Sequence, residues 1–338
     1  MLVSVLTPVL DEEAHLGEVV ARMQAQDLEG EVEFLFVDGG STDASRAILA
    51  ELSADDSRIV VLENPRRRTP FALNVGLRAA RGEFVARMDA HTRYQPTYLR
   101  LGVERLRAGG ATHVSGPQLA VGDGRPWSER VALALSTPLG AGGASFRSLS
   151  DDEFEVDTGF TGMWRRDVLQ RAGGWDEEWL TDQDCELAFR LHASEPGAHI
   201  CVPAMAAEYI PRDSLGSLRR QYWQYGLHKV NTFRRHPTAM RPSHLLPPVV
   251  AATAAAAPVS RVARGGLAAY GLALGATAAR AAAGGAKPAD AAALPLVFAT
   301  MHLAYGFGLF AGVRRYGVPA AALQGALGQA RRLPIRFG

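Results

Sequence analysis

The stretch from Glu83 to His91 carries the residue types in this chain that are best suited to binding chemistry. It reads as a short apolar strand that ends in an aspartate and a histidine, Asp89 and His91, two positions apart. Side chains two apart on an extended segment point the same way, so both would face one ligand. A carboxylate and an imidazole suit a divalent cation such as Mn²⁺, with a phosphate as the third party. The same pattern fits a strand that runs into a polar turn, and the neighbouring elements decide between the two.

The elements around this stretch alternate between apolar strands and amphipathic helices. The pattern predicts strands over 2–6, 33–37 and 58–62 and in the stretch just described, and helices over about 15–23, from about 44, and over 71–80. A β-α-β-α-β-α-β order predicts a parallel, doubly wound sheet. Ligands bind such a sheet beyond the carboxyl ends of its strands, which is where Asp89 would lie.

The ends of these strands supply carboxylates rather than a glycine-rich phosphate loop. The loop after the first strand lacks the GxGxxG that places a dinucleotide pyrophosphate on a helix, which argues against a nicotinamide or flavin dehydrogenase. Asp11 and Glu12 follow the first strand, Asp38 ends the second, and Asp89 ends the fourth. Carboxylates suit ribose hydroxyls, the N–H edge of a base and a metal, and they suit phosphate only through that metal.

The chain after residue 150 has a less regular pattern. It predicts one strand over 154–164 whose glycines allow close backbone approach, a short helix over 165–172 that ends at a glycine pair, and a helix over 185–193. Thr181 or Asp182 is expected to cap the last of these helices. Ser41 or Thr42 is expected to cap the helix that begins near residue 44.

Composition limits the class of protein. The 36 Lys and Arg nearly balance the 35 Asp and Glu among 338 residues, so no global field recruits nucleic acid. After Asp213 only Asp290 is acidic, and this asymmetry marks a boundary near residue 240. Two cysteines, Cys185 and Cys201, argue against a disulfide framework and fit a reducing compartment. The first residues lack the basic region and cleavage site of a secretory signal.

Taken in order, these motifs resemble those of the family 2 inverting glycosyltransferases of GT-A fold, within them the bacterial exopolysaccharide enzymes of the succinoglycan-biosynthesis type. The resemblance covers about residues 1–230 and rests on Thr7–Glu13 (commonly P-x-x-N-E in the family), Val37–Asp43, Ala72–Leu77, Gly82–His91, Gly173–Glu177 and Asp182–Leu187. It implies an α/β GT-A fold, with a mainly parallel sheet flanked by helices. It also implies transfer of a sugar from a nucleotide-diphospho-sugar, with a UDP-sugar expected, to a hydroxyl with inversion.

The resemblance also implies roles for individual residues. It places the donor near Pro8, Asp11, Glu12, Asp38, Asn74, Arg87 and Asp89. Asp89 stands at the first aspartate of the family's D-x-D motif and His91 takes the second place, where both would hold Mn²⁺ or Mg²⁺. Asp184 matches the catalytic base, in a motif usually written E-D in which Gln183 replaces the glutamate. Further candidates for acceptor or diphosphate contact are Trp175, Asp182, Gln183, Arg219, Tyr222 and Trp223.

Several of these residues have a structural interpretation beside the functional one. The run Arg66–Arg68 can face the diphosphate, an anionic membrane or only solvent. The indoles of Trp175 and Trp179 suit stacking on an acceptor sugar and equally a place in the core. Asn74 can stabilise its own loop or the donor. Gln224 stands where processive members have the arginine of Q-x-x-R-W, which favours transfer of a single sugar.

The proposed chemistry needs a cation at the diphosphate and a base at the acceptor hydroxyl. A second reading is a non-catalytic nucleotide-sugar-binding or scaffolding subunit of a polysaccharide assembly complex, because Asp-x-His and Gln-Asp depart from the family motifs. A glycoside hydrolase fits less well. It needs paired carboxylates about the scissile bond, but it gives no reason for Asp38 and Asp89 at strand ends.

The last hundred residues are apolar and predict a membrane region over 241–338, after a catalytic domain over 1–240. Ala291 to Val313 is a stretch of 23 uncharged residues, enough to span the ~30 Å of a bilayer's hydrocarbon. The stretch 265–286 is a second candidate span. The stretch 245–259 is broken by prolines and is expected to be interfacial or re-entrant. A buried Ala-rich helical domain is the alternative.

Arginines flank the expected hairpin on both sides. They are Arg234, Arg235, Arg241, Arg261 and Arg264 before it, and Arg314, Arg315, Arg331, Arg332 and Arg336 after it. The positive-inside bias puts both groups, and the catalytic domain, on the cytoplasmic side of a bacterial-type inner membrane. A lipid-linked saccharide acceptor at that surface follows, with Tyr222, Trp223 and Tyr225 in the approach. The donor sugar, the linkage and the oligomeric state stay open.

Overall fold

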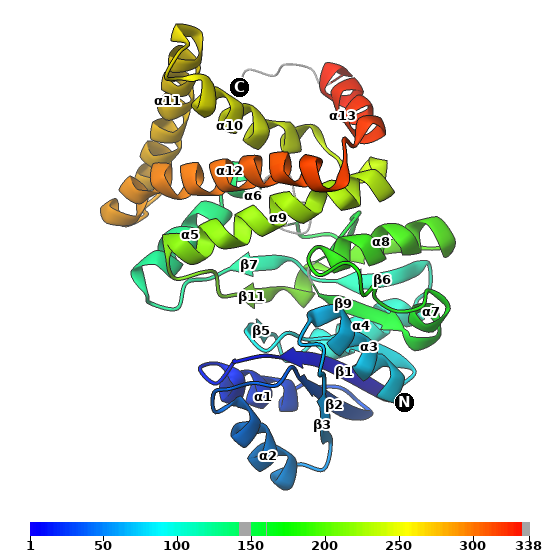
Figure 1. The fold of residues 1–338 in the computed structure, drawn as a ribbon. Coiled ribbons are helices and arrows are strands. Elements are labelled where there is room, and N and C mark those ends of the chain that lie inside the picture. Colours follow the sequence, from blue (N-terminus) through cyan, green and yellow to red (C-terminus); the bar gives the residue numbers. More distant parts are fainter. Residues whose placement is uncertain (142–149, 160, 333–338) are drawn as a thin grey trace. The chain divides into compact units, whose positions relative to one another are not determined.

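In the computed structural model, which describes residues 1–141, 150–159 and 161–332, strands and helices alternate through the first ninety residues (Figure 1). The elements are β1 (Leu2–Val9), α1 (Leu16–Gln24), β2 (Glu31–Asp38), α2 (Ser45–Asp55), β3 (Ile59–Glu63), α3 (Thr69–Ala79) and β4 (Phe84–Arg87). β1 pairs in parallel with both β2 and β4, and β2 pairs in parallel with β3. The predicted parallel alternation is confirmed.

The main sheet has eight strands in the order β3-β2-β1-β4-β9-β6-β10-β8. Its later strands are β6 (Ala111–Ser115), β8 (Phe154–Glu155), β9 (Gly162–Arg165) and β10 (Ala198–Cys201). β10 runs parallel to β6, whereas β9 is antiparallel to both β4 and β6, and β8 is antiparallel to β10. The sheet is therefore mostly parallel, as predicted, with two antiparallel strands, β9 inside the sheet and β8 at its edge.

The single strand predicted over 154–164 is wrong. The stretch instead contributes β8 at the edge of the sheet and β9 at its centre; Phe160, within the same stretch, lies outside the described residues. The glycines of this stretch do allow close approach. A Cβ on Gly162 would lie 2.1 Å from His113 Nε2, and one on Gly159 would lie 2.7 Å from His199 Cε1. Side chains at these two positions would collide with the neighbouring strands.

Helices cover both faces of the main sheet. α4 (Tyr98–Arg107) and α1 pack with one cluster of buried side chains, while α3, α7 (Arg166–Arg171) and α8 (Gln183–Ser194) pack with the other. Alternate residues of a strand point to opposite faces. Accordingly Val5 of β1 belongs to the first cluster, whereas Leu6 belongs to the second. A second, three-stranded sheet in the order β5-β11-β7 was not predicted; it consists of β5 (Thr92–Tyr94), β7 (Gln118–Ala120) and β11 (Ala207–Tyr209).

The two predicted helix caps turn out differently. α2 starts after Ala44, and no side chain of Ser41 or Thr42 caps it, which contradicts the prediction. The carboxylate of Glu13 accepts a hydrogen bond from Ala44 N at 2.8 Å instead, so a residue from the loop after β1 binds the N-terminal end of α2. Asp182 does stand at the N-cap of α8, but in the left-handed region at φ 70° and without a side-chain cap bond.

The chain divides into two compact units, each made from two stretches of sequence. The first unit comprises Met1–Leu119 and Ser145–Tyr209, and the second comprises Ala120–Ala144 and Ile210–Gly338. The main sheet and its helices belong to the first unit. The sequence boundary expected near residue 240 follows composition, whereas these units follow packing.

The second unit is helical. Its helices are α5 (Pro126–Leu135), α6 (Pro138–Ala141), α9 (Leu215–Arg235), α10 (Leu246–Ala256), α11 (Arg261–Ala283), α12 (Pro288–Tyr316) and α13 (Ala320–Arg332), with short 3₁₀ turns over Pro237–Ala239 and Pro242–Leu245. α9 and α12 run side by side (Figure 1). A Cβ on Gly226 of α9 would lie 2.2 Å from Tyr305 O, and one on Gly308 of α12 would lie 2.4 Å from Trp223 O. Glycine is therefore needed where these backbones meet.

One helix in the described part of the chain, α12, is long and apolar enough to cross a membrane. It contains the expected span 291–313, and half of its apolar window is buried by the protein itself. The other expected span, 265–286, coincides largely with α11, and the stretch 245–259 largely with α10. Arg336 of the last basic group lies outside the described residues.

Candidate active site

A pocket of about 120 Å³ lies in the first unit, beyond the carboxyl ends of β1, β2 and β4. Its lining residues are Pro8, Val9, Leu10, Glu12, Gly39, Asn64, Arg67, Arg68, Thr69, Ala72, Arg87, Asp89 and His91. The pocket thus forms where a parallel α/β sheet binds its ligands. Of the residues expected at the donor or the metal, it brings together Pro8, Glu12, Arg87, Asp89 and His91.

Arg87 joins the two carboxylates that the sequence placed in different roles. Its guanidinium donates two hydrogen bonds to Asp89, from Nε to Oδ1 at 2.7 Å and from Nη2 to Oδ2 at 2.9 Å. Its third nitrogen, Nη1, donates to Asp184 Oδ1 at the start of α8. Asp89 is buried at the end of β4, and its backbone N–H donates to the hydroxyl of Tyr94 at 2.8 Å. One buried cation therefore lies between Asp89 and Asp184.

These contacts and burial shift the pKa values of the pair that Arg87 and Asp184 form. Burial raises the pKa of Asp184 to about 6, although the charge of Arg87 opposes the shift. Burial alone would lower the pKa of Arg87, but the charges of Asp184 and Asp89 raise it above its ordinary value. Arg87 is therefore a permanent cation, whereas Asp184 takes up and releases a proton close to neutral pH.

Glu12 and His91 meet at the pocket from two different strands. Glu12 follows β1 and His91 follows β4, and His91 Nδ1 lies 3.2 Å from Glu12 Oε1. The imidazole also approaches the ring of Tyr209 edge-on, with the ring centroids 6.2 Å apart. Neighbouring parallel strands thus bring a carboxylate and an imidazole together, a contact that the spacing of Asp89 and His91 did not predict.

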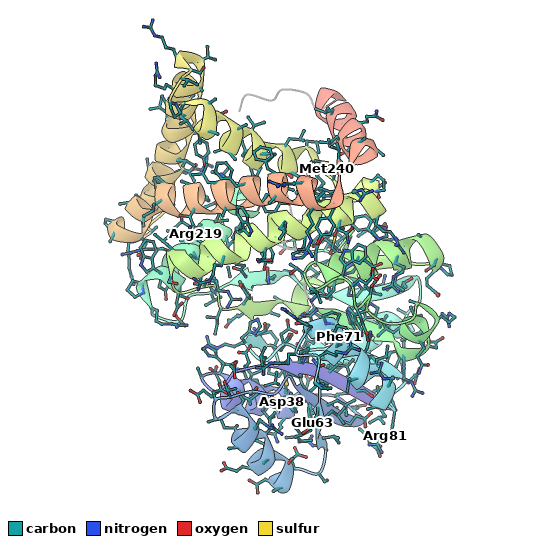
Figure 2. All side chains as sticks on the ribbon, viewed as in Figure 1. Asp38, Glu63, Phe71, Arg81, Arg219 and Met240 are labelled. Carbon is teal, nitrogen blue, oxygen red and sulfur yellow. The ribbon has the colours of Figure 1, made fainter. Side chains whose placement is uncertain are left out.

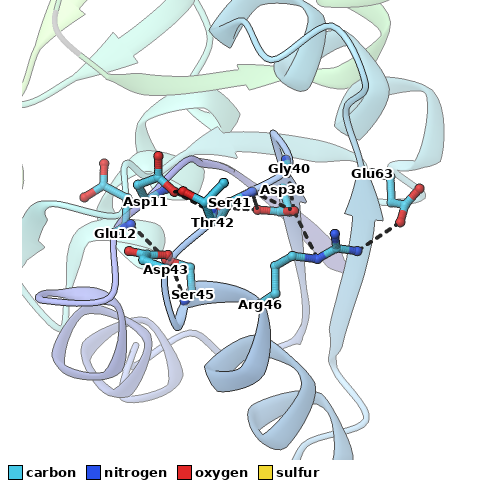
Figure 3. A network of polar contacts seen from close by, with 10 residues as sticks. All are labelled: Asp11, Glu12, Asp38, Gly40, Ser41, Thr42, Asp43, Ser45, Arg46 and Glu63. Atoms are coloured by element: carbon cyan, nitrogen blue, oxygen red, sulfur yellow. Dashed lines mark hydrogen bonds and ion pairs between the residues drawn. The ribbon is translucent and has the colours of Figure 1, made fainter.

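Asp38 is occupied by its own loop (Figure 3). Its carboxylate accepts hydrogen bonds from Gly40 N at 3.0 Å and from Ser41 Oγ at 2.6 Å, and it lies 3.6 Å from Arg46 Nε. Asp38 is buried and does not line the pocket, where its neighbour Gly39 does. These contacts show that Asp38 shapes the loop after β2, and Gly39 of this loop forms part of the pocket wall.

The loops after β1 and β2 hold each other in place (Figure 3). Asp11 Oδ1 accepts a hydrogen bond from Thr42 N at 2.7 Å, and Asp11 N donates to Ser41 Oγ at 3.0 Å. Glu12 N donates to Ser45 Oγ at 2.8 Å. The backbone of Glu12 is therefore fixed by the second loop while its side chain lines the pocket. Asp11 contributes to the pocket through this bracing.

The basic wall of the pocket was only partly visible in the sequence. Arg67 and Arg68 line the pocket, whereas Arg66 lies over the ring of Phe71, 5.1 Å from its centroid. Asn64 shapes this loop by donating to Arg68 O at 3.0 Å and accepting from Arg66 N at 3.2 Å. Sequence reasoning missed Asn64; the signal was an asparagine and a proline directly after a strand.

Asn74 and Trp175 lie away from the pocket, within the core. The side chain of Asn74, on α3, bonds the backbone of Trp175, and the indole of Trp175 is only 1% exposed among the side chains between α3 and α8. Trp175 meets Trp164 edge to face, with the ring centroids 5.7 Å apart. Trp179 is buried as well. For both tryptophans the structure shows the core placement that the sequence left open.

The remaining candidates are distributed over both units. Gln183 is buried in the first turn of α8, directly before Asp184 and after Asp182. Arg219, Tyr222 and Trp223 are on α9 of the second unit, and Figure 2 labels Arg219 there. The pocket itself contains none of these residues.

A divalent cation would find a partial set of ligands in the pocket. Asp89, His91 and Glu12 offer oxygen and imidazole nitrogen, which suit Mn²⁺ or Mg²⁺. Within the described ranges, however, no three or more His, Cys, Asp or Glu side chains are grouped so as to hold a metal on their own. A cation here would draw its other ligands from phosphate oxygens and water, which is how Mg²⁺ is usually bound beside a phosphate.

Comparison with known proteins identifies the family. The family model for glycosyl transferase family 2 matches residues 4–172. The chain is 29% identical to the succinoglycan biosynthesis protein ExoA of Rhizobium meliloti (strain 1021) over 250 residues, which are 73% of this chain and 74% of that protein. It is 27% identical over 239 residues to a dolichyl N-acetyl-alpha-D-glucosaminyl phosphate 3-beta-D-2,3-diacetamido-2,3-dideoxy-beta-D-glucuronosyltransferase of Methanococcus voltae, covering 67% of this chain and 72% of the other.

A solved structure shares the fold. The mannosyltransferase PcManGT from Pyrobaculum calidifontis, in complex with GDP-Man and Mn²⁺, superposes with a TM-score of 0.61 at 21% identity, over 97% of this chain and 87% of that one. The family match and this likeness point to the same fold. The chain therefore belongs to glycosyl transferase family 2, and it is a glycosyltransferase of GT-A fold.

Proposed function

We propose that this glycosyltransferase moves one sugar from a nucleotide-diphospho-sugar, foremost a UDP-sugar, to a hydroxyl of a lipid-linked saccharide in cell-surface or exopolysaccharide synthesis, with inversion. The observation that carries the proposal is the pocket at the strand ends. It combines acidic ligands, Glu12 and Asp89, with a basic wall, Arg67 and Arg68, in one small space. A nucleotide diphosphate needs both kinds of group.

The basic wall suits the diphosphate, and the carboxylates suit the nucleoside. Arg67 and Arg68 line the pocket, and a guanidinium group pairs well with phosphate oxygens. Pro8 and Glu12, at the end of β1, are the candidates for contact with the ribose or base. Asp11 and Asp38 support this wall through the loop contacts described above.

A divalent cation, Mn²⁺ or Mg²⁺, held by Asp89 and His91 would neutralise the charge of the leaving diphosphate. The support for this proposal is the donor set at the pocket and the Mn²⁺ in the related mannosyltransferase structure. The protein's own contribution at this point is Arg87, which orients the carboxylate of Asp89 through two hydrogen bonds.

Asp184 is the proposed base that takes the proton of the acceptor hydroxyl. A carboxylate whose pKa lies near 6 is mostly ionised at neutral pH, yet it is more basic than an ordinary aspartate. The contact with Arg87 fixes its orientation relative to Asp89. Attack of the acceptor oxygen on the anomeric carbon, opposite the diphosphate, forms the new glycosidic bond with inversion. The bond between that carbon and the diphosphate oxygen breaks, the nucleoside diphosphate leaves, and the hydroxyl proton goes to Asp184.

The lipid-linked acceptor and the membrane location rest on the second unit and on the relatives. The Methanococcus voltae relative is named for a dolichyl-linked phosphate substrate. In this chain, α12 is a candidate membrane span, and α11 exposes Val262 by 87% and Leu272 by 76%. We propose that α11 and α12 form the membrane-associated hairpin, with the sheet of the first unit on the cytoplasmic side of the inner membrane. Arg219, Tyr222 and Trp223 of α9, which lies beside α12, would then be near the acceptor.

The test is a panel of nucleotide sugars incubated with the purified protein, Mn²⁺ and a membrane extract, with products read by mass. One donor should yield a lipid-extractable product heavier than its acceptor by a single sugar. Several sugars added in one encounter would contradict single-sugar transfer. Tight binding of UDP or GDP without turnover of any donor would favour the non-catalytic nucleotide-sugar-binding subunit instead.

A further inference from the structure

The segment between α7 and α8 is held from both sides by side chains that no part of the proposed reaction uses. It runs from Ala172 through a pair of glycines and Trp175 to the start of α8, which carries Asp184. We propose that Asn74 is a positioning residue for Asp184: it clamps this segment to α3 and so sets the place of the base relative to the donor pocket. The inference rests on the proposed function in taking Asp184 as the base.

All the hydrogen bonds described for the side-chain amide of Asn74 go to the segment between α7 and α8. Nδ2 donates to Trp175 O at 2.8 Å and to Glu177 Oε1 at 3.0 Å, and Oδ1 accepts from Trp175 N at 2.9 Å. A side-chain amide has two N–H donors, so neither is left for a ligand. Asn74 is 8% exposed and is absent from the lining of the pocket. These contacts favour the structural alternative over direct contact with the donor.

The glycine before Trp175 is shaped to receive this side chain. Gly174 has φ +73°, a backbone conformation that residues other than glycine rarely adopt. A Cβ at this position would lie 2.4 Å from Asn74 Oδ1. Glycine is therefore needed at position 174 for two reasons: the backbone angle, and the space that the side chain of Asn74 takes up.

A second clamp comes from α8 itself. Arg190 Nη2 donates to Gly174 O at 2.8 Å, and another of its nitrogens donates to Ala172 O. Glu186, one turn earlier on α8, holds the guanidinium with two hydrogen bonds of 2.9 and 2.8 Å. The segment is thus fastened to α3 by Asn74 and to α8 by Arg190, which ties the two helices together.

The same α3 also forms part of the donor pocket. Thr69 and Ala72, in its first turns, line the pocket, and Asn74 follows within the next turn. The donor pocket and the base are therefore linked through few elements. α3 forms part of the pocket wall, Asn74 joins α3 to the segment, and the segment leads into α8, which carries Asp184. Reaction geometry is sensitive to such supports, since a displacement of about 1 Å can cost about 100-fold in rate. Loss of Asn74 should therefore lower kcat and leave the binding of the donor intact.

The test uses the full-length chain with Asn74→Asp, which keeps the shape of the side chain, removes both N–H donors and sets a carboxylate against Trp175 O and Glu177. Arg190→Lys, in the second clamp, is the independent variant. Gln24→Ala is the matched control, because it also removes an amide hydrogen bond in the first unit, to Asp56 at 2.7 Å. Two readouts are needed: amide hydrogen exchange, and kcat and donor KM with the donor that the nucleotide-sugar panel selects.

For Asn74→Asp we expect faster exchange over residues 174–184, a kcat about 10- to 100-fold lower and a donor KM within about twofold of the wild type. Arg190→Lys should change the same quantities in the same direction, and Gln24→Ala should change none of them. A raised donor KM with unchanged kcat would overturn the proposal, because it would mean that Asn74 contacts the donor. Unchanged exchange over 174–184 would overturn it as well. If the wild type turns over no donor, the proposed function fails, while the exchange data still decide whether Asn74 holds the segment.

Discussion

The guanidinium of Arg87 contacts the carboxylates of Asp89 and Asp184, which the proposed reaction uses as metal ligand and as base. Substitution of Asp184 tests the role of the base separately. Asp184→Asn keeps the size of the base but cannot accept the acceptor proton, so kcat should fall by about 100-fold or more. Binding of UDP or GDP, measured by calorimetry, should stay within about threefold, because Asp184 does not line the pocket. Glu178→Gln removes an exposed charge from the preceding segment and should leave kcat unchanged. Retained turnover in Asp184→Asn would refute the assignment.

The pH profile of turnover is a second test of the same residue. Burial raises the pKa of Asp184 to about 6, and the base works only when it is deprotonated. The rate should therefore climb as pH rises from 5 to 7, with its midpoint near pH 6, and then level off. The measurement is kcat at saturating donor across this range. A rate already level at pH 5 would mean that the group responsible has the pKa of an ordinary aspartate.

His91 can be tested through the dependence on metal. If it holds the cation together with Asp89, His91→Ala should raise the Mn²⁺ concentration for half-maximal activity by at least about tenfold, since even indirect partners of a metal contribute that much. His15→Ala, a histidine outside the pocket, is the control. An unchanged Mn²⁺ requirement would leave Asp89 as the protein's ligand and His91 only as a neighbour of Glu12.

Sequence patterns located the pocket residues better than they located the supporting ones. Asp89 and His91 were predicted to face one ligand from their spacing and from the carboxylates at the other strand ends, and both line the pocket. The bracing role of Asp38 was not visible, because its partners Gly40 and Arg46 become partners only once the loop folds back. The link between Asn74 and Trp175 spans 101 positions and has no local signal at all.

At the scale of elements, β6 and β10 bring two buried histidines together. The rings of His113 and His199 stack with centroids 3.6 Å apart, and His113 also stacks on Trp164 at 4.2 Å. Burial lowers the pKa of His113 to about 3 and lowers that of His199 as well. Both imidazoles are therefore neutral in the folded state, whereas in the unfolded chain they take up protons below about pH 6.5.

This pair should make the first unit sensitive to acid. The folded pKa lies below the unfolded one, so its contribution to stability is present above about pH 6.5 and is lost as pH falls toward 3. For His113 alone the loss at pH 5 is about 2 kcal/mol relative to neutral pH. His113→Gln, which cannot titrate, should show a smaller drop in melting temperature between pH 7.5 and 5 than the wild type does. Equal drops in the two proteins would contradict the account.

Periodicity predicted best the strands and helices whose own sequence repeats apolar residues at strand or helix spacing. The strands β1 to β4 and the helices α1 to α3 are long enough to show this spacing, and strands and helices follow one another in regular alternation along the chain. The three-stranded sheet was invisible because each of its strands has only three residues and pairs with a distant segment. The prediction of one strand over 154–164 failed because β8 and β9 are both extended but belong to different places in the sheet.

At the scale of the whole molecule, charge and apolar exposure favour binding to an anionic bilayer. No acidic residue occurs between Ser214 and Lys287, while α11 carries Arg261 and Arg264 beside its exposed apolar side chains. We expect the protein to float with phosphatidylglycerol vesicles more than with phosphatidylcholine vesicles at low salt, and we expect 0.5 M NaCl to reduce the difference. Arg261→Gln with Arg264→Gln should weaken the preference, and Arg22→Gln should not. Equal flotation with both lipids would contradict it.

The two-stretch composition of the second unit has a consequence for biosynthesis. α5 packs against α12, and Arg130 of α5 pairs with Asp290 of α12, 160 positions later at 3.2 Å. The first unit has all its strands once Tyr209 has left the ribosome, but α5 must wait for α12. At about 5–20 residues per second, that wait lasts about 10–30 s, during which the apolar side of α5 has no partner from α12. A chain that stops before residue 288 would stay in that state permanently.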